Sequence, residues 1–191
     1  QKALKNAGED YEIAEGEGAF YGPKIELHIK DSMGRSWQLG TIQVDFCMPE
    51  SLDLTYIASS GKKERPVMIH RAIYGSFERF FGVLLEHYKG KLPFWLSPVQ
   101  VKVLTITDSQ KEYAKDIMQK LMDNKIRVEL DKSGNPIAQQ IKIAQLEQVP
   151  WMLVLGEKEQ NNQTITLRHR DSKQEFGLTI DEILKRAKEN N

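Results

Sequence analysis

The sequence predicts two domains of different fold class, an α+β domain in residues 1–97 and an α/β domain in residues 98–191. Three observations support this. The chain has 191 residues, more than one average domain needs. Gly90, Pro93 and Pro98 fall within one short stretch and predict a domain boundary there. Before that stretch strands are separated by turns, and after it strands alternate with helices.

An antiparallel sheet is expected in the first domain. Residues 24–30 alternate polar and apolar side chains, which is the period of a half-buried strand. Residues 31–34 predict a turn in which Gly34 can adopt a positive φ. Residues 35–46 predict a second strand, with Gly40 at a bulge or a point of close approach.

A strand followed by a helix closes the first domain. Residues 51–66 are polar and rich in turn formers, so we expect a hairpin or loop that reaches into solvent. Residues 67–73 predict a short apolar strand. Residues 77–88 carry apolar side chains at helical spacing, and Ser76 is well suited as the N-cap of that helix.

The second domain is predicted to be a compact α/β domain with a mixed sheet. We expect strands at residues 99–106, 127–130, 151–155 and 163–170, and helices from Asp108 or Ser109 as the cap to about residue 123, at residues 136–148 and at residues 181–190. The strand at 151–155 is almost uninterruptedly apolar, which is typical of a buried central strand. The strand at 163–170 alternates and is expected at the edge.

Composition restricts the possible functions. The 27 basic and 27 acidic side chains cancel, so any contact with nucleic acid must come from local charge. A single cysteine cannot form an internal disulfide, which favours a reducing compartment such as the cytoplasm. No run of about 18 apolar residues predicts a membrane span. Because the chain opens on Gln1 within a charged stretch, we expect it to be part of a longer protein.

Four segments resemble threonyl-tRNA synthetases and occur in the same order as in that family. They are AFYGPKI at residues 19–25, WQLGTIQVDF at 37–46, PVMIHRA at 66–72 and GSFERF at 75–80, and the resemblance continues through 95–101 and 149–154. It implies the end of a class II synthetase core, with the strand and helix of motif 3, followed by an anticodon-binding domain. Related synthetases lack this His before Gly-Ser-x-Glu-Arg, so the resemblance is specific to threonine.

Arg79 lies near the start of the motif 3 helix. A guanidinium is planar and always charged, and it can both stack on a base and pair with phosphate. Taken alone, Arg79 is more often a surface arginine near Glu78 and Glu86. The resemblance implies a catalytic role, in which Arg79 covers the adenine ring and contacts a phosphate of ATP.

His70 lies inside an apolar strand, where a lone histidine is more often a satisfied core residue than a metal ligand. The resemblance makes it one of three protein ligands of a Zn²⁺ ion that binds the amino group and hydroxyl of threonine. The other two ligands lie upstream in the family. Cys47, His28, His87 and His169 match no ligand position, and Cys47 is expected to be a small buried apolar residue. We expect this chain alone not to hold zinc tightly.

Six further residues match positions that line the pocket in the family: Tyr21, Lys24, Gln38, Thr41, Gln43 and Ser76. The resemblance places Tyr21, Gln43 and Ser76 around threonine and zinc. It places Lys24, as a second catalytic residue, with Gln38 and Thr41 at the phosphate and ribose of the adenylate. Without the motifs, such polar residues are ordinary strand positions. Activation of a carboxylate by ATP needs no protein nucleophile, so catalysis rests on positioning and charge neutralisation with Mg²⁺.

Glu159 and Arg168 match the anticodon-reading surface of the family, where a carboxylate accepts from a base and a guanidinium contacts a base or phosphate. Residues 131–142 depart from the family because they carry less positive charge. We expect this departure to weaken phosphate contacts and to flatten the salt dependence of tRNA binding.

Two hypotheses follow. The first is an enzyme that activates L-threonine with ATP and transfers it to tRNA(Thr), as a homodimer. The second is a synthetase-like module that binds tRNA without catalysis, since the first two class-defining motifs are not in this sequence. The enzyme is favoured because Arg79, His70, Lys24, Gln38 and Gln43 are all present. The isolated chain is expected to be inactive.

Overall fold

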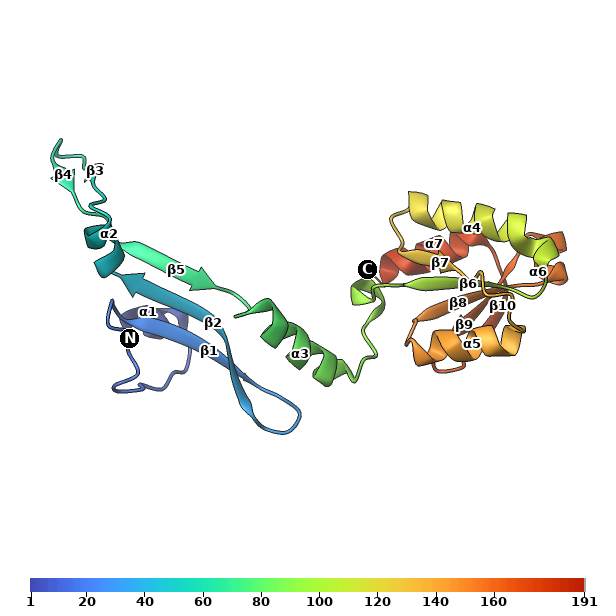
Figure 1. The fold of residues 1–191 in the computed structure, drawn as a ribbon, viewed down its shortest axis with the longest axis horizontal. Coiled ribbons are helices and arrows are strands. Elements are labelled where there is room, and N and C mark those ends of the chain that lie inside the picture. Colours follow the sequence, from blue (N-terminus) through green and yellow to red (C-terminus); the bar gives the residue numbers. More distant parts are fainter. Residues whose placement is uncertain (191) are drawn as a thin grey trace. The chain divides into compact units, whose positions relative to one another are not determined.

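The computed structural model describes residues 1–190 and divides into two compact units, Gln1–His87 and Tyr88–Asn191. Figure 1 shows the elements of both units, coloured along the sequence. The assignment of the domains to residues 1–97 and 98–191 remains a prediction.

The first unit is built on the predicted antiparallel sheet. After a short helix α1 (Lys2–Ala7), strand β1 (Lys24–Lys30) pairs with β2 (Ser36–Asp45), which in turn pairs with β5 (Met68–Ala72). Both pairings are antiparallel, and the strand order is β1-β2-β5. The turn between β1 and β2 contains Gly34 at a φ of +78°, as the sequence predicts.

A β-bulge interrupts the pairing of β1 with β2. Leu27 pairs with Gly40 and His28 pairs with Gln38, so Leu39 is an extra residue on β2. A Cβ on Gly40 would lie 2.7 Å from Leu27 Cδ1, which confirms a close approach at this glycine. The extra residue moves the Gln38 side chain to the face that it would not occupy in a regular strand.

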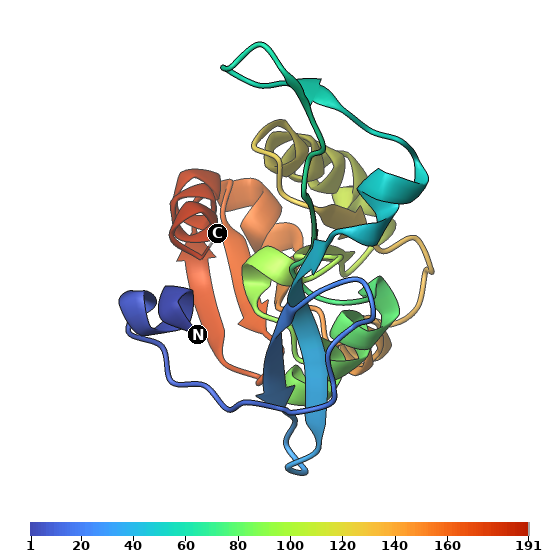
Figure 2. The ribbon, with the colours of Figure 1, turned by 90° about the vertical axis from the view of Figure 1, so that its left-hand side faces the viewer.

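Three short elements and a longer helix complete this unit. Helix α2 (Cys47–Ser51), which the sequence did not predict, has only five residues, too few to show a period. Strands β3 (Tyr56–Ile57) and β4 (Lys63–Glu64) form the expected hairpin, which projects beyond the sheet (Figure 2). Helix α3 (Phe77–Tyr88) has the predicted bounds, and Ser76 Oγ accepts a hydrogen bond from a backbone N–H of its first turn.

A mixed five-stranded sheet forms the second unit, with the order β10-β9-β8-β6-β7. The strands are β6 (Val101–Thr105), β7 (Val128–Leu130), β8 (Trp151–Leu155), β9 (Ile165–His169) and β10 (Gln174–Leu178). β6 is parallel to β7 and to β8, whereas β8–β9 and β9–β10 are antiparallel. The mixed sheet and the central, buried position of β8 are confirmed.

The expectation that residues 163–170 form an edge strand was wrong. β10 pairs outside β9 and takes the edge. The alternation that suggested an edge has another cause, because Thr166 and Arg168 face the side of the sheet that a single helix covers.

Helices cover the two faces of the second sheet unequally, and the main core lies under the better covered face. Figure 1 shows α4 (Lys111–Asp123) and α7 (Ile180–Glu189) on one face and α5 (Ile137–Leu146) on the other. The larger core cluster includes Ile117 and Leu121 from α4, Ile183 and Ala187 from α7, and Val101, Val103, Leu153, Leu155, Ile165 and Leu167 from the sheet. Under α5 a smaller cluster joins Leu104, Ala144 and Met152.

Short helical turns begin or connect these elements. A 3₁₀ turn at Phe94–Leu96 precedes β6, and α6 (Glu157–Asn162), which was not predicted, follows β8. The expected cap at Asp108 or Ser109 was wrong. A 3₁₀ turn over Asp108–Gln110 precedes α4, and Thr107 caps this turn with its backbone N–H donating to Gln110 Oε1 at 3.0 Å.

Candidate functional site

One face of the β1–β2–β5 sheet gathers polar side chains predicted for the pocket. Residues directly opposite each other on paired strands share a face. The rows read Lys24–Gln43–His70, Glu26–Thr41–Ala72 and, beyond the bulge, His28–Gln38. The bulge therefore brings Gln38 to the same face as Thr41 and Gln43, from which strict alternation would have excluded it.

Three of these predicted residues form the first cluster. Tyr21 donates from its hydroxyl to Gln43 Oε1 at 2.8 Å. The Tyr21 ring also packs edge-to-face against the His70 imidazole, with 6.3 Å between ring centroids. Tyr21, Gln43 and His70 are thus in mutual contact, although they are separated by up to 49 positions in the chain. The sequence predicted Tyr21 and Gln43 around the amino acid together with Ser76, and His70 as a metal ligand; Ser76 instead contacts the first turn of α3.

Asp45, which the sequence analysis did not single out, completes this cluster. Its Oδ2 lies 2.8 Å from His70 Nε2, and its Oδ1 accepts from the backbone N–H groups of Cys47 at 2.8 Å and Met48 at 2.9 Å. Asp45 is only 4% exposed. The Met48 amide and then the His70 ring lower the pKa of Asp45 below its ordinary value, because both stabilise the charged carboxylate.

A second cluster forms around Glu26, which was also not predicted. Glu26 Oε1 lies 2.6 Å from Lys24 Nζ and accepts from Gln38 Nε2 at 2.8 Å, while Oε2 lies 3.5 Å from His28 Nε2. The hydrogen bond between Lys24 and Glu26 raises the pKa of Lys24 and lowers that of Glu26, so both groups stay charged. Lys24 and Gln38 are therefore held together by a shared carboxylate.

Arg79 and Ser76 lie where helix α3 begins. Arg79 Nη1 donates to the Gln38 carbonyl at 2.9 Å, which ties the first turn of α3 to β2. Arg79 N–H donates to Ser76 Oγ at 3.2 Å, so the hydroxyl of Ser76 serves as a cap in this structure. Within residues 1–190, the buried Thr41 Oγ1 has no hydrogen-bonding partner and could serve a ligand.

His70 lies beside a buried carboxylate, that of Asp45, whereas the carboxylates beside His28 and His169 are partly exposed. Among residues 1–190, no group of three His, Cys, Asp or Glu side chains is placed to hold a metal. Cys47 is exposed, so the expectation that it is buried was wrong; it opens α2, and its backbone N–H rather than its side chain contacts Asp45. His70, with one ring nitrogen on a carboxylate, matches the usual surroundings of a zinc-ligating histidine.

In the second unit, the predicted residues Glu159 and Arg168 lie with Thr166 at one side of the sheet. Glu159 Oε2 accepts from the Gly156 N–H at 3.0 Å and Oε1 accepts from Thr166 Oγ1 at 2.8 Å. Thr166 and Arg168 alternate on β9 and so share a face. In the described part of the chain, the buried Nε of Arg168 lacks a partner. Sequence analysis missed Thr166, whose role depends on a contact with α6.

The hydrogen bonds that hold residues 131–142 use the carboxylate of Asp131 and the amide of Gln140. Asp131 Oδ1 accepts from the Ser133 N–H at 2.8 Å, and Gln140 Nε2 donates to the carbonyls of Thr105 at 3.1 Å and Asn135 at 2.7 Å. Neither Lys132 nor Lys142 takes part in these contacts.

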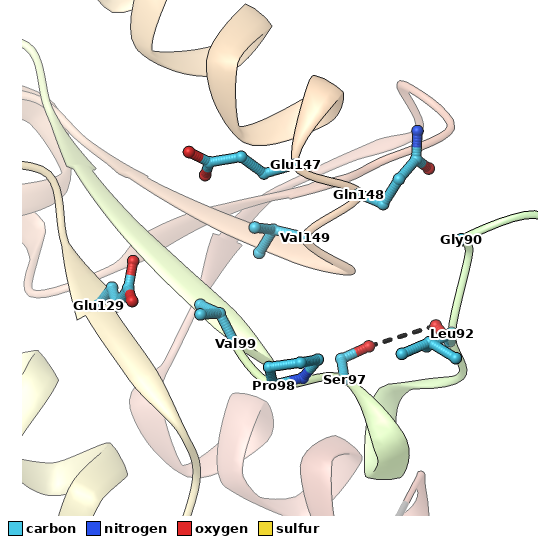
Figure 3. A pocket seen from close by; sticks show the side chains of 9 residues that line it. All are labelled: Gly90, Leu92, Ser97, Pro98, Val99, Glu129, Glu147, Gln148 and Val149. Carbon is cyan, nitrogen blue, oxygen red and sulfur yellow. Dashed lines mark hydrogen bonds between the residues drawn. The ribbon is translucent and has the colours of Figure 1, made fainter. Parts of the chain in front are cut away.

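A separate cavity of about 270 Å³ opens between the start of the second unit, β7 and the end of α5. Leu92, Ser97, Val99, Glu129 and Glu147 are among its lining residues (Figure 3). None of the site residues predicted from the sequence lines it, so it is distinct from both clusters and from the Glu159 surface.

Over residues 1–190, the structure contains no helix that is both long enough and apolar enough to cross a membrane.

Each of the two units matches a known family of protein domains. Residues 3–88 match the family model described as the tRNA synthetase class II core domain (G, H, P, S and T), and residues 100–190 match the anticodon binding domain. The threonine–tRNA ligase of Clostridium novyi (strain NT) is 57% identical over 169 residues, which cover 88% of this chain and 26% of the relative. That of Clostridium tetani (strain Massachusetts / E88) is 50% identical over 184 residues, 96% of this chain and 29% of the relative.

Solved structures agree with this placement. The RNA binding domain of threonyl-tRNA synthetase from Cryptosporidium parvum Iowa II has a TM-score of 0.89 and 43% identity, over 100% of this chain and 48% of that one. Prolyl-tRNA synthetase from Cryptosporidium parvum has a TM-score of 0.72 at 18% identity, over 93% of this chain and 38% of that one, which shows a shared fold. The chain spans less than a third of the length of these two curated relatives.

Proposed function

The chain belongs to the threonyl-tRNA synthetase family, and on that premise we propose that it forms part of a threonine–tRNA ligase. The reaction activates L-threonine with ATP to threonyl-adenylate and then transfers the threonyl group to the 3′ end of tRNA(Thr). The observation that carries this proposal is the polar sheet face, because five residues predicted for the pocket share it: Lys24, Gln38, Thr41, Gln43 and His70.

At the amino-acid end of this face, Tyr21 and Gln43 orient threonine through the hydroxyl and amide that already contact each other. His70 supplies one ligand to Zn²⁺, with the remaining ligands outside these 191 residues. When bound, zinc offers coordination positions to the amino group and the hydroxyl of threonine. Valine lacks the hydroxyl and would leave such a site incompletely paired, and recognition of that kind discriminates more strongly than shape alone.

At the ATP end, Lys24 and Arg79 neutralise phosphate charge, and the Arg79 guanidinium also stacks on adenine. Gln38 and the unpartnered hydroxyl of Thr41 donate to the ribose and phosphate. Glu26 Oε1 lies 2.6 Å from Lys24 Nζ and holds the ammonium group on the sheet face until a phosphate group of ATP competes for it. Together with Mg²⁺ bound to ATP, these groups position and stabilise the transition state without a protein nucleophile.

The second unit reads the anticodon through Glu159 and Arg168. The Glu159 carboxylate is held by two hydrogen bonds and retains free lone pairs for a base N–H. The Arg168 side chain, whose buried Nε has no hydrogen-bonding partner among the described residues, contacts a base or phosphate. Because residues 131–142 carry only Lys132 and Lys142 as cations, tRNA binding depends on salt less steeply than in the family at large.

The remaining assignments belong to the same proposal. The ligase works in the cytoplasm, in agreement with its single, exposed cysteine, and it forms a homodimer. Residues 1–97 complete the catalytic core, and residues 98–191 are the anticodon-binding domain.

Aminoacylation of tRNA(Thr) tests this proposal in a protein of the relatives' length that contains this chain. Threonylation is expected there and not with the isolated 191 residues. Zinc content of the same protein is expected to be one ion per subunit and to fall to zero in His70→Ala. His28→Ala, which changes a histidine on the same sheet face, is expected to retain zinc. Specific binding of tRNA without any threonylation would favour the alternative, a non-catalytic tRNA-binding module.

A further inference from the structure

One ring nitrogen of His70 makes a hydrogen bond with a buried carboxylate, and this bond determines whether the other ring nitrogen carries a proton. His70 Nε2 lies 2.8 Å from Asp45 Oδ2. In the described part of the chain, Nε2 is the only ring nitrogen of His70 with a hydrogen-bonding partner. The side chain of His70 is 38% exposed, so the ring is open to a ligand.

Asp45 cannot easily turn away from this contact. Its Oδ1 accepts from two consecutive backbone N–H groups at the start of α2, those of Cys47 and Met48, at 2.8 and 2.9 Å. Rotation of the carboxylate would cost both of these bonds in a site where Asp45 is only 4% exposed. The second oxygen, Oδ2, is therefore fixed in the direction of the His70 ring.

The direction of the hydrogen bond follows from the chemistry of the two groups. An aspartate with an ordinary pKa of about 4 is ionised at neutral pH and can only accept hydrogen bonds. His70 Nε2 must then donate. A neutral imidazole carries one proton, so the Nε2–H tautomer leaves its lone pair on Nδ1.

We propose that Asp45 is a positioning residue that holds His70 in the Nε2–H tautomer, so that Nδ1 is the atom that binds the metal. The inference rests on the zinc ligation proposed above for His70. Histidines that bind metals commonly donate their second ring N–H to a carboxylate, which fixes the tautomer and makes the ligating nitrogen more basic. Gln43 lies directly opposite His70 on β2 and shares its face. A residue proposed to orient threonine is therefore the neighbour of the proposed metal ligand.

Asp45→Asn separates this role from the capping role of the same side chain. Asparagine is as good an N-terminal helix cap as aspartate. Its oxygen is expected to stay on the two N–H groups of α2, because an NH₂ group in that place would face two donors. The NH₂ group then faces His70 Nε2, which must accept. The proton moves to Nδ1 and blocks the metal-binding lone pair.

Long-range ¹H–¹⁵N NMR of the 191-residue chain at pH 8 reads this tautomer directly. With His70→Gln used to assign the signals, the wild type is expected to show His70 with its proton on Nε2. Asp45→Asn is expected to move the proton to Nδ1. The control Asp53→Asn, which affects the exposed partner of Arg65 in the same unit, leaves the His70 signals unchanged. A wild-type His70 with its proton on Nδ1, or an Asp45→Asn spectrum like the wild type, overturns the inference.

Zinc titration of the protein of the relatives' length provides the second readout. Asp45→Asn is expected to lower zinc affinity by about 10- to 100-fold, the usual cost of losing such a partner. Unchanged affinity in a correctly folded Asp45→Asn protein overturns the inference alone, whereas a wild type that binds no zinc overturns the zinc assignment itself. Asp45→Ser serves where the Asn variant does not fold, because serine keeps a cap and is expected to leave His70 as a mixture of tautomers.

Discussion

The hydroxyl of Thr166 offers a sharp test of the anticodon surface. It donates to Glu159 Oε1 at 2.8 Å, and Thr166 is only 6% exposed. Thr166→Val keeps the size and the branched shape of the side chain and removes only this donor. A hydrogen bond to a charged group contributes about 1.5–3 kcal/mol. Because Glu159 is partly exposed and keeps its bond to the Gly156 N–H, we expect about 1 kcal/mol.

If Glu159 reads a base, this loss of positioning should appear in tRNA binding. A change of about 1 kcal/mol corresponds to about a fivefold increase in Kd for tRNA(Thr). Equilibrium binding at fixed salt measures it, with urea unfolding of each variant to separate loss of affinity from loss of fold. When the anticodon base that Glu159 contacts is replaced in the tRNA, the Kd of the wild-type protein should rise to the Kd that Thr166→Val shows for unaltered tRNA(Thr).

Two control variants make the result specific. Thr166→Ser keeps the hydroxyl and is expected to bind tRNA within about twofold of the wild type, a difference below 0.5 kcal/mol. Thr164→Val changes a nearby threonine whose hydroxyl makes no contact with Glu159 in the described residues. Wild-type affinity in Thr166→Val, or an equal loss in Thr166→Ser, would refute the reasoning.

Three further predictions concern catalysis and stability. Arg79→Ala is expected to lower ATP–pyrophosphate exchange by the protein of the relatives' length at least about 100-fold, as for other lost transition-state donors, and a loss below tenfold contradicts its role. Glu147→Gln is expected to destabilise the second unit by about 1–3 kcal/mol in urea, because Lys102 is 7% exposed and loses the negative charge of its partner. Lys102→Met should be neutral or stabilising, and equal costs would contradict this. Arg186 and then His169 lower the pKa of Glu175 from 4.5 to about 2, so its contribution is complete above pH 4.5 and is lost as the pH falls towards 2; Glu175→Gln should remove this part of the urea midpoint's pH dependence, and an unchanged profile would contradict it.

Periodic elements of the fold could be predicted from the sequence because their signals are local. β1 and α3 have the predicted bounds, since alternation in the strand and helical spacing in the helix each repeat several times. The cap of the turn before α4 was missed although its signal was present. Thr107 and Gln110 form a T-x-x-Q capping box, whereas Asp108 and Ser109 are also good capping residues by type.

Elements that depend on pairing were not predictable in the same way. Alternation in β9 suggested an edge strand, yet β10 pairs outside β9, and Thr166 and Arg168 of β9 lie on the sheet face opposite the main core. The bulge at Leu39 is another case, because Gly40 marks the region but does not state which residue is extra. Periodicity alone would have placed Gln38 on the wrong face of the sheet.

The candidate site could likewise be predicted only in part from the sequence. The motifs identified His70, Lys24 and Glu159 by type and order, but not the groups that hold them. Asp45 and Thr166 act through contacts that form only when strands pair or a helix packs, 25 and seven positions from their partners. A carboxylate beside a histidine is therefore a property of the fold, and the sequence alone could not have revealed it.

The central claim is tested most directly by ATP–pyrophosphate exchange in a protein of the relatives' length that contains this chain. The account predicts exchange that depends on threonine, falls by orders of magnitude when valine replaces threonine, and is lost in His70→Ala. A folded, zinc-loaded protein that exchanges with valine as well as with threonine, or that shows no exchange while binding tRNA(Thr), would contradict it.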